Sequence, residues 1–305
     1  TINPGYAKSY EYLGTAYQNL SKYEKALSSY LELARIDFRS PTAHFKVGVA
    51  YSQLGRNHDA IESFQEATLW NKEFPEAHYN MGWLYQELGE TDNALDQYEK
   101  VVNFEPDNLD AHFQIGEIHE SLRLYQKASS AFQNVVDINP EFVEGHVRLG
   151  WNYAKQDRPK EALAEFEMAL QINPNLEETY YQLGITYGEL GRFEEGLEAL
   201  QNSRRLNPDH LETLLQLGKF NSILGNYQEA NKYLNLTRKI APNSSSEMGL
   251  LSGKSLAQMN QFEQALPHLK KAVMQNPDSF DAQFYLGLSL IRLNRPAEAI
   301  APYLK

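Results

Sequence analysis

The stretch HYNMGWLYQEL, from His78 to Leu88, decides the fold, because its frame returns as HVRLGWNYAKQ from His146 to Gln156. Both stretches hold His, three variable residues, Gly-Trp, one variable residue and Tyr, and they start 68 residues apart. A glycine marks this frame every 34 residues, with a single step of 35, at Gly14, Gly48, Gly82, Gly116, Gly150, Gly184, Gly218, Gly253 and Gly287. A fixed period of this length predicts an array of structural repeats.

Fixed columns of residues accompany this landmark glycine. The residue before it is large and apolar in most repeats, and the third residue after it is usually Tyr. A small residue and then a large one follow twelve and sixteen positions after the glycine, as in Ala26 and Tyr30, Ala60 and Phe64, Ala94 and Tyr98, Ala128 and Phe132, and Ala162 and Phe166. Apolar residues three and four apart form one stripe on a helix. Each repeat is therefore expected to be two antiparallel helices that pack closely through the small residues.

Turn residues separate the expected helices. Gly follows Leu at LGR (54–56), LGE (88–90), LGR (190–192) and LGN (224–226). Gly at this place takes the left-handed conformation that ends a helix. We expect Asn260 and Asn294 to take the same conformation in their repeats. Pro ends the second helix in six repeats, because it has no amide proton and restricts the residue before it.

The combined pattern resembles the tetratricopeptide repeat: Tyr or His, two residues, Leu-Gly, two residues, Tyr, then Ala-x3-Phe and Pro. The resemblance covers the whole chain, with eight full repeats and part of a ninth. It implies an all-α fold, a right-handed superhelical α-solenoid of antiparallel helix pairs, with the first helix of each pair on the concave face. We expect a single solenoid over residues 1–305, with repeats starting near residues 7, 41, 75, 109, 143, 177, 211, 246 and 280.

Two features interrupt the regular array. In the eighth repeat, Gly249 and Ser252 replace large residues, and the preceding turn PNSSSE (242–247) has one extra residue. Loose packing would lower local stability, so we expect a softer or kinked junction near residues 243–252. At the ends, Ile2–Pro4 matches the close of a repeat, and Lys305 falls inside an expected second helix. We therefore expect the sequence to be an excerpt of a longer array or protein.

Composition excludes several classes of function. The formal net charge of −12 argues against a nucleic-acid partner, which requires a footprint of Lys and Arg. The absence of Cys excludes disulfides, cysteine-zinc sites and cysteine nucleophiles. No apolar run approaches the ~20 residues of a membrane-spanning helix. No motif of a phosphate-binding loop, a zinc protease or a serine hydrolase occurs, so we expect no catalytic residue, no metal and no cofactor.

The concave face is the expected place of function. On the first helix, the positions six and three before the landmark glycine and one, four and five after it share an arc that is distinct from the core arc. This arc carries the candidate partner-binding residues Phe45, Tyr79, Trp83, Phe113, Glu117, Trp151, Lys155, Tyr181, Glu76, Asp110 and Glu144. Trp83 and Trp151 hold equivalent places two repeats apart, and aromatic residues on fixed helices are usual interface anchors. The aromatic residues three before the glycine have an alternative interpretation, as packing between neighbouring repeats.

Two polar columns also have alternative interpretations. Seven successive repeats carry an acid six positions before the glycine, from Glu76 to Asp281. These acids would attract a basic peptide, or they would stabilise the first helix through its dipole. The histidines His44, His78, His112 and His146 stand four positions before the glycine. Neighbours one repeat apart cannot share one metal ion at bonds of ~2 Å, so we expect them to replace a bulky packing residue.

The leading hypothesis is a non-catalytic scaffold that binds a peptide, a helix or a partner protein along its concave aromatic and acidic groove, within a larger assembly. Some members of the family clamp acidic tails with Lys and Asn on this face, but here the matching columns carry Phe45, Tyr79, Trp83 and Glu117. This departure favours a basic or apolar segment as the partner. Two alternatives remain open: a substrate-recruiting arm of an enzyme whose catalytic domain lies elsewhere, and a structural subunit that binds through its convex face or ends. The sequence does not fix the compartment.

Overall fold

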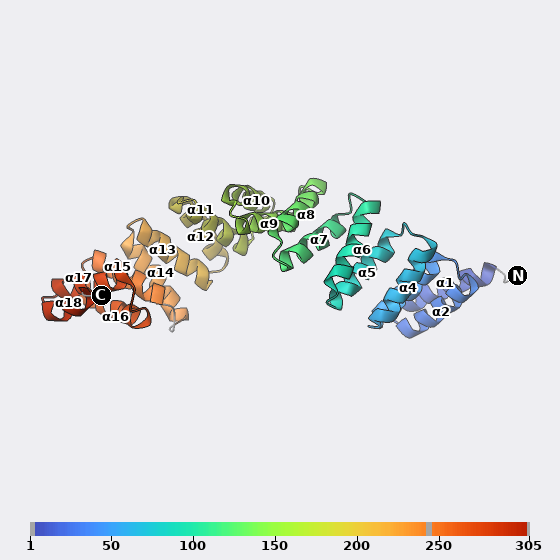
Figure 1. Cartoon of the computed structure of the whole chain (residues 1–305), viewed down its shortest axis with the longest axis horizontal. Helices are drawn as coiled ribbons and strands as arrows, with labels where there is room; N and C mark the ends of the chain where they lie inside the picture. The colour runs from blue at the N-terminus through green and yellow to red at the C-terminus, as the bar shows by residue number, and fades with distance from the viewer. Residues whose placement is uncertain (1–3, 242–245, 304–305) are drawn as a thin grey trace. The chain divides into compact units, whose positions relative to one another are not determined.

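The computed structural model describes residues 4–241 and 246–303, and all regular structure within these residues is α-helical (Figure 1). The all-α fold is therefore confirmed. Two compact units divide the chain, Thr1–Gly145 and His146–Lys305, and their boundary falls within one helix. Each unit is described by itself below.

The first unit contains four helix pairs and the start of a ninth helix. Its helices are α1 (Pro4–Asn19), α2 (Tyr23–Ile36), α3 (Pro41–Gln53), α4 (Asn57–Trp70), α5 (Pro75–Glu87), α6 (Thr91–Phe104), α7 (Leu109–Ser121), α8 (Tyr125–Ile138) and α9 (Val143–Lys155), of which α9 continues into the second unit. Within this unit each helix packs against the next one in the chain, from α1 to α8.

The second unit continues the same pattern of paired helices. Its further helices are α10 (Pro159–Ile172), α11 (Glu177–Glu189), α12 (Phe193–Leu206), α13 (Leu211–Ile223), α14 (Tyr227–Ile240), α15 (Ser246–Gln258), α16 (Phe262–Gln275), α17 (Phe280–Arg292) and α18 (Pro296–Tyr303). Here the first helices of successive pairs also touch one another, α11 with α13, α13 with α15, and α15 with α17. The odd-numbered helices of the pairs therefore form one layer, and the even-numbered helices form the other.

The landmark glycine packs against the large residue sixteen positions later in the same repeat. A Cβ atom added at Gly82 would lie 2.8 Å from the Tyr98 ring, and one at Gly150 would lie 2.8 Å from the Phe166 ring. Both rings are almost completely buried, at 0% and 1% exposure. Because a side chain at the glycine would collide with the ring, the pair fixes the separation and register of the two helices. This contact explains why the two columns repeat together in the sequence.

The turns between paired helices all use the left-handed backbone conformation. Gly89 has φ +75° and Gly191 has φ +72°, as their Leu-Gly sequences predict. The expectation for Asn260 and Asn294 is also confirmed, because their φ values are 60° and 57°. The sequence did not predict that three other residues take this conformation at the equivalent turn, namely Ser21, Arg123 and Asp157.

The eighth repeat has a polar contact where the other repeats have an apolar one. Ser252 is completely buried, and its hydroxyl accepts a hydrogen bond of 3.3 Å from the Arg238 guanidinium. Burial lowers the pKa of Arg238. The turn expected to be soft lies mainly outside the described residues, which omit 242–245. At position 252, a buried hydrogen bond therefore stands where most other repeats have a large apolar side chain.

Candidate functional site

One stripe of α5 carries the most exposed candidate aromatic residue. Glu76, Tyr79, Trp83 and Glu87 follow one another at spacings of three or four residues, which places them on one side of the helix. Trp83 is 45% exposed, and both glutamates are exposed. Tyr79 is half-buried and packs edge-on against the Tyr98 ring, with centroids 5.4 Å apart. We call these four residues the Trp83 stripe. An indole held this way presents a large apolar surface to solvent.

The aromatic residues three positions before the landmark glycine are shared between binding and packing. The Phe45 ring lies 5.4 Å from the Phe64 ring and 5.1 Å from the Phe74 ring, which directly precedes the first helix of the next repeat. Phe113 repeats this arrangement, with its ring 5.5 Å from that of Phe132 and 5.6 Å from that of Phe142. These candidates are half-buried, so much of each ring serves the junction between neighbouring repeats.

Carboxylates of α7 face the Trp83 stripe. The pKa of the Tyr79 hydroxyl is raised by burial and by the negative charges of Asp110 and Glu117. Such a shift requires the carboxylates to lie close to the phenol, because charge interactions decline with distance. Asp110 is exposed, and Glu117 accepts a hydrogen bond of 3.2 Å from the Gln114 amide. The surface around Tyr79 is therefore both aromatic and negatively charged.

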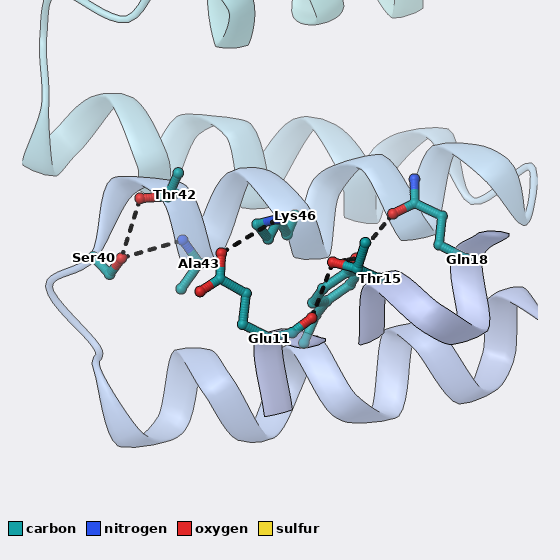
Figure 2. A network of polar contacts seen from close by, with 8 residues as sticks. Glu11, Thr15, Gln18, Ser40, Thr42, Ala43 and Lys46 are labelled. Atoms are coloured by element: carbon teal, nitrogen blue, oxygen red, sulfur yellow. Dashed lines mark hydrogen bonds and ion pairs between the residues drawn. The ribbon is translucent and has the colours of Figure 1, made fainter. Parts of the chain in front are cut away.

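The first two repeats present a different, internally paired surface. Lys46 of α3 lies 3.5 Å from Glu11 of α1, and its ammonium lies 5.6 Å from the centre of the Tyr30 ring (Figure 2). The Tyr30 hydroxyl donates a hydrogen bond of 2.9 Å to Gln18 and lies 3.2 Å from the Thr15 hydroxyl. Figure 2 shows this network spanning the first helices of two neighbouring repeats. Here the chain supplies its own cation for the carboxylate and the aromatic ring.

The second unit holds the other candidate indole in a covered state. Trp151 is half-buried, and the ammonium of Lys155 lies over its ring, 5.0 Å from the centroid. This distance is within the range of a cation–π interaction. Glu144, in the first turn of α9, is exposed. The structure thus gives Lys155 a definite contact, on the indole four residues before it.

Tyr181 belongs to a polar cluster of the second unit. Its ring meets the His210 ring edge-on at 5.3 Å, and its pKa is raised by burial and by the charges of Glu178 and Glu212. Potential metal-ligand atoms of Glu177, Glu178 and His210 lie within 4.8 Å of one another. The two ring nitrogens of His210 face Glu177 at 3.0 Å and Glu212 at 3.2 Å. His210 Nδ1 also lies 2.7 Å from the Thr213 hydroxyl, so the side chains of this cluster already contact one another and their neighbours.

Three histidines of the column contact the loop before their own helix, whereas the ring of His146 lies 2.7 Å from the Glu165 carboxylate. The Nε2 atoms of His44 and His112 each lie 2.8 Å from the carbonyl oxygen of the residue six positions earlier. His78 makes the same contact at 3.3 Å. In the ninth repeat Gln283 stands in this column, and its amide donates a hydrogen bond of 3.0 Å to the carbonyl six positions earlier. The imidazoles thus serve as hydrogen-bonding residues of the loop as well as packing groups.

A second exposed aromatic cluster was not predicted from the sequence. Trp70, at the end of α4, is 41% exposed and meets the Phe38 ring edge-on at 6.0 Å. The Arg39 guanidinium lies over both rings, at 5.3 Å from Phe38 and 5.6 Å from Trp70. The signal was present in the sequence, because most repeats carry Ile or Leu where Trp70 stands. This cluster lies apart from the first-helix arc.

No helix in residues 4–241 and 246–303 is long and apolar enough to cross a membrane. This finding agrees with the short apolar runs of the sequence.

Known structures share this arrangement of helix pairs. YrrB, described as a TPR protein with an unusual peptide-binding site, matches with a TM-score of 0.56 and 22% identity over 66% of this chain and 99% of its own. PilW, a type IV pilus biogenesis factor, matches with a TM-score of 0.53 and 20% identity over 70% and 98%. MamA matches with a TM-score of 0.52 and 22% identity over 56% and 93%. At these identities the likeness concerns the fold. No relative is found among curated proteins.

Family models extend the match along the chain. A model described as tetratricopeptide repeat matches residues 13–78, 181–245 and 250–305. Further models of the same repeat match residues 75–108, 109–142 and 143–176. The limits of these three single-repeat matches follow helix pairs of the structure, so sequence and structure identify the same repeating unit. The chain belongs to the tetratricopeptide repeat family.

Proposed function

We propose that this chain is a protein-interaction scaffold whose first-helix face binds a segment of a partner protein. The observation that carries the proposal is the exposure of Trp83 on a helix that is fixed by its packing against α6. Buried aromatic anchors contribute a large share of binding energy at protein interfaces, and Trp is among the residues most enriched at such positions. A solvent-exposed indole on an ordered helix is a favourable place for such an anchor.

The neighbours of Trp83 support an extended binding surface. Tyr79 lies one helical turn before it, and Phe113 belongs to the next first helix. Both rings are half-buried, so they offer an edge to a partner without requiring a rearrangement of the repeats. The likeness to YrrB, whose published description names a peptide-binding site, supports the same class of function for this fold. The partner bound here is proposed to be a protein segment.

A peptide-display selection against the complete chain tests this function. Selected peptides would be synthesised, and their dissociation constants would be measured for the parent and for Trp83→Ala. We expect Trp83→Ala to weaken binding about tenfold or more, as replacement of an interface anchor typically does. Circular dichroism would verify that the exposed replacement leaves the helices intact.

Trp70→Ala provides the matched control. Trp70 is 41% exposed, close to the 45% of Trp83, but it lies at the end of α4 and outside the first-helix arc. Selected peptides should bind Trp70→Ala as they bind the parent. Equal binding to the parent and to Trp83→Ala for all selected peptides would refute the proposed function of this face.

A further inference from the structure

The two repeats that carry Gly-Trp differ at one decisive position. Their stripes read Glu76, Tyr79, Trp83 and Glu87 in α5, against Glu144, Val147, Trp151 and Lys155 in α9. The last residue of each stripe lies one helical turn after the indole, about 6 Å along the helix axis. It is an acid after Trp83 and a base after Trp151. The sequence therefore reverses the sign of charge beside two otherwise equivalent indoles.

The base beside Trp151 shows what this kind of indole binds. The Lys155 ammonium lies over the ring at 5.0 Å, where the negative face of the aromatic system attracts a cation. Lys46 over Tyr30 in the first unit is another such contact. In these places the chain supplies the cation from its own sequence.

The surroundings of Trp83 favour a cation that comes from outside. On α5 and α7, the first-helix arc contains no Lys or Arg among its described positions, whereas Glu76, Glu87 and Asp110 are all exposed acids there. Burial raises the pKa of Tyr79, and the charges of Asp110 and Glu117 on α7 raise it further, in keeping with the acidic character of this surface. A surface of one sign of charge attracts and orients partners of the opposite sign.

We propose that Trp83 receives an arginine or lysine side chain of a basic partner segment, with Glu76 and Glu87 as the flanking carboxylates. The inference rests on the proposed function and names the chemistry of its partner. The cation lies over the indole face, as the Lys155 ammonium lies over Trp151, and a neighbouring basic residue of the segment pairs with an exposed acid. Trp151 is occupied by its own lysine and takes no part in this recognition.

The test uses a fluorescein-labelled peptide in which arginine alternates with glycine, and the same peptide with citrulline in place of arginine. Citrulline keeps the shape of arginine and removes its charge. Fluorescence anisotropy with the complete chain would give the dissociation constants. We expect the arginine peptide to bind at least about fivefold more tightly than the citrulline peptide, and Trp83→Leu to remove about fivefold of its affinity.

Three further variants identify the source of the effect. Trp83→Phe should retain part of the affinity, because its ring still has a negative face. Glu87→Lys should weaken binding more than Trp83→Leu does, since it places a competing cation beside the indole and removes a carboxylate. Trp70→Leu, at an exposed indole outside the first-helix arc, should leave the affinity unchanged. Because Trp83→Leu preserves every charge, non-specific attraction to the acidic chain persists in it and is subtracted by the comparison.

The results separate this inference from the function on which it rests. Equal affinities of the parent and Trp83→Leu for the arginine peptide would overturn the inference, and so would equal affinities of the parent for the arginine and citrulline peptides. Display-selected peptides that require Trp83 but bind equally well after their arginines are replaced by citrulline would leave the proposed function standing and overturn the cation-binding role. Selected peptides that ignore Trp83 would overturn both.

Discussion

Trp83 and Trp151 occupy the same place in their repeats but have different surroundings. Trp83 is 45% exposed with Glu87 one turn later, whereas Trp151 is half-buried under the ammonium of Lys155. The backbone frame of the two repeats is the same, so the difference comes from side chains: Lys155 lies over Trp151, and Trp151 also packs against the buried cluster that contains Phe166. A repeat array thus keeps its fold by conserving the columns between helices, while the exposed columns are free to change their chemistry from one repeat to the next.

The largest expected effect is a loss of stability when the contact between a landmark glycine and its aromatic partner is disrupted. Gly82→Ala would place a Cβ atom 2.8 Å from the buried Tyr98 ring and should lower the free energy of unfolding by about 2–3 kcal/mol. Gly150→Ala should act in the same direction, since it meets Phe166 at 2.8 Å and the Ala162 carbonyl oxygen at 3.2 Å. Urea unfolding followed by circular dichroism measures both changes.

Gly89→Ala is the matched control for the collision. Gly89 has φ +75° and open space around its missing side chain, so alanine adds only backbone strain of about 1 kcal/mol. A loss of stability in Gly82→Ala no larger than that in Gly89→Ala would show that the glycine–aromatic contact does not fix the hairpin.

The next effect is the exchange of charge beside the two indoles. In chains that retain a single Trp, Glu87→Lys should reduce the quenching of Trp83 fluorescence by acrylamide, and Lys155→Glu should increase the quenching of Trp151. An exposed cation–π contact contributes about 0.5–1 kcal/mol, so a partial but measurable change is expected. Lys155→Gln would separate the loss of the cation from the gain of an acid. Unchanged quenching in all three variants would contradict the electrostatic account of the difference.

The smallest effect is the contribution of one buried histidine to the pH dependence of stability. Tyr stands three residues after the landmark glycine at Tyr85 and Tyr153, but His119 takes this place between them. His119 is 7% exposed, and its pKa is lowered by burial and by the charge of Lys127. As the pH falls, the His119 imidazole is therefore protonated at a higher pH in the unfolded chain than in the folded chain. Stability is highest above the usual value of 6.5 and is lost as the pH falls from 6.5 towards the lower pKa of the folded state.

His119→Tyr should reduce this dependence. Thermal unfolding at several pH values between about 7 and 5 would compare the variant with the parent, and the variant should lose less stability in acid. His268 of the second unit also has a lowered pKa, caused by burial and by the charges of Arg238 and Lys271, so part of the dependence will remain. An identical acid response in the variant and the parent would show that His119 does not contribute.

Much of the fold was predictable because it depends on short columns with simple physical meaning. The spacing of the landmark glycines gave the helix pairs, and Leu-Gly sequences located turns such as Gly89 and Gly191. The left-handed conformations of Arg123 and Asp157 were not predictable from propensity, because the rigid frame on either side imposes the turn whatever residue occupies it.

The candidate site was less predictable, because exposure depends on neighbours in space. Phe45 and Phe113 are half-buried since Phe74 and Phe142, which directly precede the next first helices, lie against them. The contact between Lys155 and Trp151 depends on a side-chain conformation that spacing permits but does not require. The sequence predicted that these residues share one arc of the first helix, whereas only the structure distinguishes an exposed indole from a covered one. The binding role of the face remains a prediction.

The contact between each landmark glycine and its aromatic or leucine partner has a consequence for how such chains change in evolution. Gly82 and Tyr98 belong to one repeat, as do Gly150 and Phe166. Each hairpin therefore contains both residues of the contact that holds its two helices together. Loss or duplication of a whole 34-residue repeat leaves this contact intact in every remaining hairpin. The number of repeats can therefore change in whole steps, which would let a lineage lengthen or shorten its array without redesigning any single hairpin.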